Sequence, residues 1–303
     1  MIYENRPILS ICIPTYNRCE HIKRQIETFA KEKLVDVEVI VSCNPVDEND
    51  LTVSYLKELK FEWLKININK INVGPTKNFD ICLNMAAGEY IWCLGDDDYF
   101  KKNMLQVIIP ILKAKQPTVY HMNYYNYDSK NKKIIPNPLV KIKSFIQYSK
   151  KDYIKQFGYD FSSALFMSSN IFRNDIAKLK VEQKYAELCW AYRLYIAMNK
   201  GDCIFDDSVL VLSNTNISWT ERFNKITFDL IPSLLESLDL KRSMKIYLGI
   251  RLVQYLKHNK FKFPQEFKYN KACYLKYMFL GFWSIIKFKI FPKRKINLNE
   301  YNI

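Results

Sequence analysis

Histidine and glycine are scarce in this chain, with 3 and 7 occurrences among 303 residues, and several catalytic motifs are missing. His21, His121 and His258 lie far apart, which argues against a histidine-based metal site or catalytic triad. No G-x-G-x-x-G or Walker loop follows the first predicted strand, and no G-x-S-x-G elbow occurs. These absences argue against dinucleotide oxidoreductases, P-loop enzymes and hydrolases of the nucleophile-elbow type.

The eight cysteines include no C-x-x-C pair. Cys12, Cys43 and Cys93 fall in apolar, strand-like runs, where buried free thiols are common. We therefore expect a reduced, cytoplasmic protein without a zinc site. The apolar run at residues 8–13 is too short for a signal peptide and is expected to form a strand.

The positive charge of the chain is concentrated in its last fifth. Of a net charge of +15, residues 241–303 carry +13, from 15 Lys and Arg against Glu266 and Glu300. The rest of the chain is nearly neutral, at +2. Such asymmetry predicts a separate surface for an anionic partner, either acidic lipid or nucleic acid.

An uncharged, strongly apolar run at residues 277–286 favours lipid as that partner over nucleic acid. A membrane span needs about twenty apolar residues, so this run is too short to cross a bilayer. Together with the flanking lysines it predicts a basic amphipathic helix that lies in the bilayer interface. The alternative is a terminal helix that packs on the core and exposes a solvated stripe.

Apolar runs alternate with amphipathic stretches over the first third of the chain. Strands are predicted at residues 8–13, 37–41, 63–68 and 89–95, and helices at residues 20–31, 51–59 and 76–87. The first run is almost continuously apolar, as parallel strands buried on both faces are. This alternation predicts an α/β fold with a Rossmann-like, doubly wound, mostly parallel sheet.

The pattern is more mixed farther along. It predicts a helix at 104–115 bent by Pro110, a strand at 118–127 and a loop at 131–138. A strand and then a turn are predicted at 161–172, followed by a helix opened by Glu187. A last strand is predicted at 203–212, interrupted by Asp206 and Asp207. A helical, basic pattern begins near residue 228. We therefore expect a main domain at residues 1–227 and a basic helical C-terminal region at residues 228–303.

Two groups of acids are candidates for chemistry. Asp96, Asp97 and Asp98 directly follow the predicted strand at 89–95, where ligands of open α/β sheets bind. Carboxylates there suit a hard cation such as Mg²⁺ or Mn²⁺, and the alternative is a solvated acidic turn. Glu187 stands in the predicted first turn of its helix, where the dipole favours the ionised form and suits a general base; an ordinary N-terminal helix charge is the alternative.

Several of these segments, in this order, resemble glycosyltransferase family 2. The segments are Ile11–Arg18, Val37–Asn44, Asn72–Asn78 (the N-x-G…N turn), Ala87–Asp98 (G-E-Y-I and the D-x-D motif), and Ala186–Leu188 with Arg193 and Gly201. The resemblance covers residues 8–110 well and 160–215 moderately, and ends near residue 230. It implies the type A fold and inverting transfer of a sugar from a nucleotide diphosphate sugar, such as a UDP-sugar.

The resemblance also implies roles for individual residues. Pro14, Thr15, Tyr16 and Arg18 would line the nucleotide site, with Asn44 and Lys77 near the base or phosphates and Asp96 at the ribose. Asp97 and Asp98 would hold Mn²⁺ or Mg²⁺ on the diphosphate, and Glu187 would deprotonate the acceptor hydroxyl. The acceptor would be a cell-surface glycan or a glycolipid. The basic C-terminal region, and not the resemblance, predicts that the enzyme sits peripherally on the inner face of the cell membrane.

The chain departs from the family pattern at three places. Ser42-Cys43-Asn44 stands where the family often has Asp, Gly95 aligns with the first Asp of D-x-D, and Leu188 follows Glu187 where an acid pair is common. These departures leave open a catalytically silent subunit that binds nucleotide sugar or glycan. A nucleotidyl- or phosphoryl-transferring enzyme is a further alternative, although it usually has a glycine-rich loop near the first strand, which this chain lacks.

Overall fold

The computed structural model describes residues 6–135, 146–148, 166–215, 230–237 and 298–301. Within these residues the strands form one sheet in the order β3-β2-β1-β4-β9-β6-β10-β5, with β7 paired to β6 and β8 paired to β10. The strands are β1 (Leu9–Tyr16), β2 (Val37–Asn44), β3 (Leu64–Ile68), β4 (Tyr90–Cys93), β5 (Tyr99–Phe100), β6 (Val119–Asp128), β7 (Lys133–Ile135), β8 (Ile146–Tyr148), β9 (Asn170–Arg173) and β10 (Cys203–Asn214).

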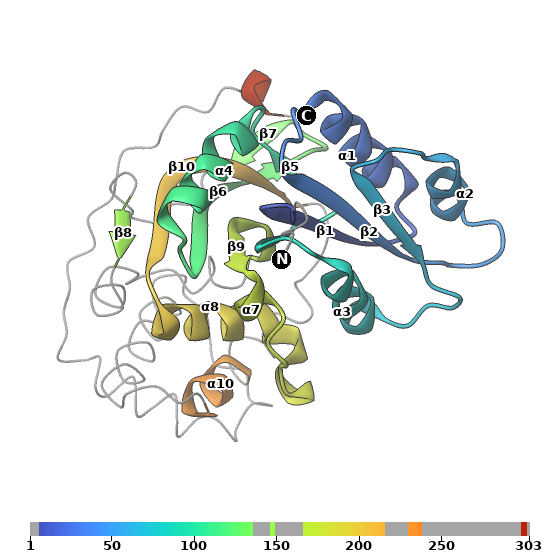
Figure 1. Ribbon diagram of the computed structural model, residues 1–303. Helices are drawn as coiled ribbons and strands as arrows, with labels where there is room; N and C mark the ends of the chain where they lie inside the picture. Colours follow the sequence, from blue (N-terminus) through green and yellow to red (C-terminus); the bar gives the residue numbers. More distant parts are fainter. Residues whose placement is uncertain (1–5, 136–145, 149–165, 216–229, 238–297, 302–303) are drawn as a thin grey trace, which may run out of the picture.

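The first half of the sheet is parallel and the second half is mixed. β3, β2, β1 and β4 run parallel, β9 is antiparallel to both β4 and β6, and β10 returns parallel to β6. Helices α1 (Cys19–Lys31), α2 (Leu51–Glu58) and α3 (Pro75–Met85) connect the parallel strands (Figure 1). The predicted α/β fold is therefore confirmed, with most of its parallel strands gathered in the first half of the sheet.

Local sequence accounts for the helix boundaries in this half. α1 buries Ile22, Ile26 and Phe29, which lie three and four residues apart on one face. Asp50 caps α2 by accepting a hydrogen bond from the Thr52 backbone N–H at 2.7 Å. At α3, Gly74 has a φ of +82°, a conformation that favours glycine, and Pro75 opens the helix.

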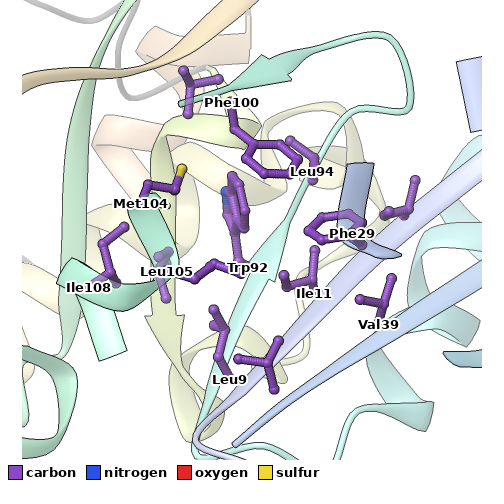
Figure 2. Packing of buried hydrophobic residues seen from close by; sticks show 14 of the residues in the cluster. Leu9, Ile11, Phe29, Val39, Trp92, Leu94, Phe100, Met104, Leu105 and Ile108 are labelled. Atoms are coloured by element: carbon purple, nitrogen blue, oxygen red, sulfur yellow. The ribbon is translucent and has the colours of Figure 1, made fainter. Parts of the chain in front are cut away.

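A large apolar core lies between β4 and the helices that cover one face of the sheet (Figure 2). The Trp92 ring meets Phe100 edge to face at 5.8 Å, and Phe100 stacks on Phe29 of α1 at 4.9 Å. Met104, Leu105 and Ile108 of α4 (Met104–Lys115) complete this cluster. β4 and the short β5, which flank the segment with the three aspartates, are thus anchored in the same apolar core through Trp92 and Phe100.

Some predicted boundaries were wrong in detail. β1 and β2 run on to Tyr16 and Asn44, because the polar residues at their ends continue the parallel ladder up to the pair Tyr16 with Asn44. β7 lies within the predicted loop at 131–138. In the serine-rich segment at 161–172, residues 161–165 lie outside the described residues, and the turn η1 (Met167–Ser169) is followed by the strand β9.

The later elements follow the remaining predictions in part. β10 pairs with β6 as a long strand, and its register shifts after Asp206, where the interruption was predicted. The helices here are α7 (Asn174–Ala177), η2 (Gln183–Leu188), α8 (Cys189–Lys200), α10 (Ile231–Ser237) and η5 (Leu298–Glu300). None of the helices in the described ranges is long and apolar enough to traverse a bilayer. The apolar run at 277–286 lies outside the described residues.

Candidate active site

The candidate site lies at the carboxyl ends of β1 and β4, where a loop of Gly95, Asp96, Asp97 and Asp98 follows β4. We call these four residues the acidic loop. β1 and β4 are parallel neighbours, so the end of β1 with Thr15 and the residues that follow it lies beside the loop. The loop carboxylates differ in exposure, since Asp96 and Asp98 are 4% and 5% exposed, whereas the Asp97 side chain is 15% exposed.

Asp96 is fixed by residues from the end of β1 and the start of α1. The Thr15 hydroxyl donates to its Oδ2 at 2.7 Å, and Arg18 Nη1 approaches its Oδ1 at 2.5 Å. The Arg18 side chain remains 31% exposed, so a ligand in solution can reach the Arg18 end of the Arg18–Asp96 ion pair. This contact brings together three residues that the resemblance assigned to one nucleotide site.

Within the described residues, Asp97 is the carboxylate of the loop with the weakest protein contacts. Its Oδ1 lies 3.6 Å from Arg18 Nη1, beyond hydrogen-bond distance. Burial, followed by the negative charge of Asp96, raises the pKa of Asp97, and Arg18 offsets this only in part. A carboxylate in such surroundings is stabilised by an arriving cation.

Asp98 points into the protein. Ser168 donates to its Oδ2 at 2.5 Å, and the backbone N–H of Asn214 donates to its Oδ1 at 3.1 Å. Burial and then the charge of Asp97 raise the pKa of Asp98 to about 8. Both oxygens of Asp98 are therefore engaged by β10 and the turn η1, and Asp98 anchors the loop from behind.

Two α1 residues hold the backbone of the acidic loop. Gln25 is 1% exposed. Its side-chain amide donates to the carbonyl oxygens of Asp98, Gly95 and Asp96 at 2.8, 3.2 and 3.4 Å. Arg24 Nη2 donates to the Asp96 carbonyl at 3.2 Å, and its guanidinium lies 3.8 Å from the Tyr99 ring centre. Neither residue was identified from the sequence.

Ser168 is a third holding residue that sequence reasoning missed. Its hydroxyl accepts from the Gly95 N–H at 2.9 Å while donating to Asp98, and its carbonyl accepts from Trp92 Nε1 at 2.8 Å. A Cβ at Gly95 would come within 2.6 Å of Asp98 Oδ2, so the close approach of the loop to this carboxyl requires glycine. The serine-rich character of residues 161–172 was the only sequence signal for Ser168.

Asparagines join the ends of β1, β2 and β3 to the start of α3. Asn78 donates to the carbonyls of Ser42 at 2.9 Å and Thr15 at 3.3 Å, and accepts from the Ser42 hydroxyl at 2.7 Å. Asn44, 2% exposed, donates to the Gly74 carbonyl at 3.2 Å and accepts from Asn69 at 2.9 Å. The Asn44 amide is thus engaged within the protein, and it shapes the turn before α3.

The remaining predicted residues lie around this edge with different exposures. Pro14 is half-buried, Tyr16 is 46% exposed, and Lys77 is exposed on the first turn of α3. Among the described contacts, no hydrogen bond or ion pair joins Lys77 to the acidic loop. Tyr16 and Lys77 are therefore placed at the edge of the site as surface groups.

Glu187 does not open an α-helix as predicted. Its backbone belongs to the 3-10 turn η2, and α8 begins two residues later, at Cys189. Farther along α8, Arg193 is 3% exposed and donates to the carbonyls of Ala177 at 2.6 Å, Cys189 at 3.1 Å and Leu179 at 3.3 Å, so it joins α8 to the end of α7 and the residues after it. Trp190 meets Phe79 of α3 edge to face at 4.1 Å, which ties this segment to the helix that carries Asn78.

The acidic loop fits a hard divalent cation that is shared with a ligand. Its donors are carboxylate oxygens, and among the described ion pairs of Asp97 the cation is Arg18, 3.6 Å from its Oδ1. In the described part of the chain, no three His, Cys, Asp or Glu side chains are grouped to hold a metal by themselves. Phosphate oxygens of a bound ligand would therefore have to complete the coordination.

Comparison with known proteins gives a family match. The model for "Glycosyl transferase family 2" matches residues 10–172, more than half of the chain. Abequosyltransferase RfbV of Salmonella typhimurium is 28% identical over 111 residues, covering 36% of this chain and 33% of that protein. The putative colanic acid biosynthesis glycosyl transferase WcaA of Escherichia coli is 25% identical over 215 residues, covering 71% and 66%. The matched part of this chain thus spans only about a third of the length of RfbV.

Solved structures show a similar fold. The crystal structure of S. aureus TarS 1-349 in complex with UDP-GlcNAc aligns with 92% of this chain and 81% of its own, with a TM-score of 0.59 and 17% sequence identity. At this identity the comparison supports the architecture alone.

Proposed function

The chain belongs to glycosyl transferase family 2, and from this membership we propose that it transfers a sugar from a nucleotide diphosphate sugar to an acceptor hydroxyl. The observation that carries the proposal is the acidic loop, which combines a fixed Asp96 with a more weakly held Asp97 at the carboxyl ends of β1 and β4. Ligands of open α/β sheets bind at this edge. The expected inversion of the anomeric carbon follows from a single displacement.

A UDP-sugar is the proposed donor. TarS, which has the same fold, was crystallised with UDP-GlcNAc. In this chain Thr15 and Arg18 hold Asp96, and we propose that Asp96 faces the ribose while Arg18 and Lys77 approach the phosphates. Pro14 and Tyr16 would line the same site. Asn44 would act indirectly, by fixing the turn at residues 72–74.

Asp97 is the proposed protein ligand of Mn²⁺ or Mg²⁺. A divalent cation supplies charge neutralisation on the leaving diphosphate when it is bound. Asp98 was predicted as a second ligand, but its oxygens accept from Ser168 and Asn214. We therefore propose that Asp98 supports the loop and that Asp97 makes the direct contact.

Glu187 is the proposed general base. The acceptor oxygen forms a bond to the anomeric carbon as the bond from that carbon to the diphosphate oxygen breaks. Glu187 takes the proton of the acceptor hydroxyl, and the nucleoside diphosphate leaves with the bonding electrons. General base catalysis of this kind contributes typically about 10²–10⁴-fold in rate.

The acceptor is proposed to be a cell-surface glycan or a lipid-linked glycan at an anionic membrane surface. RfbV is named an abequosyltransferase, and the name of WcaA refers to colanic acid biosynthesis, so both names concern glycan assembly. The net charge of +13 in residues 241–303 supports attachment to acidic lipid on the inner face of the cell membrane. The alternative is a silent subunit that binds the donor without transferring it.

A donor-turnover assay separates transfer from silent binding. The protein is incubated with a panel of nucleotide sugars and Mn²⁺, with an undecaprenyl-linked sugar as acceptor, and released nucleoside diphosphate is measured. We expect Glu187→Gln to lower kcat by about 10²–10⁴-fold while nucleotide affinity stays unchanged. Asp80→Asn, at an exposed position on α3, is the matched control. Absence of turnover with every donor, in a protein that still binds nucleotide, would favour the silent subunit.

A further inference from the structure

The last described residues of the chain pack against the strand that follows the acidic loop. Residues 298–301, which we call the C-terminal strap, comprise η5 and Tyr301. Tyr301 forms an antiparallel bridge with Lys101, the residue after β5. The strap therefore lies next to the β5 segment although about two hundred positions separate them in sequence.

Polar contacts fix the strap to the residues after β5. The backbone N–H of Lys102 donates to the Glu300 carbonyl at 3.0 Å, and Lys101 Nζ pairs with Glu300 Oε2 at 2.6 Å. Lys102 Nζ also donates to the Asn299 carbonyl at 3.2 Å. These contacts hold the backbone of the strap in one register.

Tyr301 fills an aromatic cluster beneath the strap. It is 4% exposed and packs with Tyr99, Tyr125, Tyr127 and Leu212. The rings of Tyr99 and Tyr127 meet edge to face at 5.3 Å. Burial of a tyrosine ring in such a cluster stabilises the docked position of the strap.

The same cluster supports the acidic loop. Tyr99 directly follows Asp98, and its ring lies under the Arg24 guanidinium that donates to the Asp96 carbonyl. Leu212 pairs with Tyr99 across β10 and β5, and the N–H of Asn214, two residues on, donates to Asp98. Tyr301 therefore packs against residues that directly neighbour the groups holding the loop.

β5 has only two residues, so its position depends on its neighbours. β10 pairs with both residues of β5, Tyr99 and Phe100, and the Lys101 N–H donates to the Leu210 carbonyl at 2.9 Å. The strap contributes the bridge at Lys101 on the same short segment. Loss of the strap would leave a cavity beside the Tyr99 ring and weaken the contacts that fix Asp98.

We propose that Tyr301 is a positioning residue for the acidic loop, and that docking of the C-terminal strap is required for full metal-dependent affinity for the donor. This inference rests on the proposed function of Asp96 and Asp97. The strap acts through Tyr99 and Arg24 and makes no contact of its own with the donor.

Two pairs of variants of the full chain test the proposal. Tyr301→Ala removes the ring, whereas Tyr301→Phe keeps it. Lys101→Glu places like charge against Glu300, and Lys113→Glu is its matched control, because Lys113 forms an exposed ion pair of the same 2.6 Å length with Asp36 at the other end of α4. The Lys101 and Glu300 side chains are 39% and 48% exposed. An effect of Lys101→Glu therefore cannot be attributed to unfolding of the core.

The measurement is the Kd of UDP by calorimetry, with Mn²⁺ and with EDTA, well below the unfolding temperature of each variant. We expect Tyr301→Ala to raise the Kd in Mn²⁺ about tenfold and Lys101→Glu about threefold, with Tyr301→Phe and Lys113→Glu within about twofold of wild type. Wild-type affinity in both Tyr301→Ala and Lys101→Glu would overturn the role of the strap. Failure of the wild-type protein to bind UDP or any other nucleotide would instead contradict the proposed function.

Discussion

Replacing Asp98 by Asn tests whether the acidic loop contains a carboxyl that stays protonated in the metal-free protein. Burial and the charge of Asp97 raise the pKa of Asp98 to about 8, despite the hydrogen bonds from Ser168 and Asn214. An Asp in an unfolded chain has a pKa of about 3.9. Asp98→Asn keeps the shape of the side chain and removes its titration.

The sign of the effect follows from proton binding. Between about pH 4 and pH 8 the folded protein binds one more proton at Asp98 than the unfolded chain does. The stabilising contribution of this proton is therefore complete below about pH 4 and is lost as the pH rises through about 8. Within this window the free energy of unfolding falls by about 1.4 kcal/mol per pH unit relative to a chain without the group.

The assay is urea unfolding of both proteins in EDTA at about pH 5.5, 6.5 and 7.5. We expect the difference in free energy of unfolding, wild type minus Asp98→Asn, to fall by about 2.7 kcal/mol from the lowest to the highest pH. Asp80→Asn, an exposed position on α3, is the control and should show no such trend. A difference that stays constant over the three pH values would refute the buried, protonated carboxyl.

Two further substitutions probe the same loop. Gly95→Ala should lower the free energy of unfolding by about 1–3 kcal/mol in urea, because its Cβ would lie 2.6 Å from Asp98 Oδ2; a stability equal to wild type would mean that the loop adjusts freely. Arg18→Gln removes the cation beside Asp96 and Asp97, so the Kd of UDP in Mn²⁺, measured by calorimetry, should rise about tenfold. An unchanged Kd would show that Arg18 serves Asp96 alone.

The parallel half of the fold was predictable because its signals are local. Apolar runs for β1, β2 and β4, the Asp50 cap and the turn at Gly74 and Pro75 each lie within a few residues of the element they define. The ends of β1 and β2 were placed too early, because the polarity of residues such as Ser42 resembles a loop. Asn78, more than thirty residues away, supplies the hydrogen bonds that allow that residue to remain in a strand.

The position of the candidate site was predictable from the sequence, whereas the hydrogen-bond network around it was not. The three aspartates after β4 and the segment with Thr15 and Arg18 were identified, and the structure joins them. The different surroundings of Asp97 and Asp98 could not be predicted, because they depend on Gln25, Ser168 and Asn214, which come from α1, η1 and β10. Glu187 was assigned to an α-helix because its pattern continues into α8, whereas the chain forms a 3-10 turn there and the α-helix begins at Cys189.

The central claim is that the acidic loop binds a nucleoside diphosphate together with a divalent cation through Asp97. The most direct measurement is thermal stabilisation by a panel of nucleoside diphosphates and nucleotide sugars, in Mn²⁺ and in EDTA, for wild type and Asp97→Asn. We expect UDP and its sugars to raise the Tm of wild type in Mn²⁺, with the metal-dependent part of the shift absent in Asp97→Asn. No shift with any nucleotide, or an equal metal-dependent shift in both proteins, would contradict the claim.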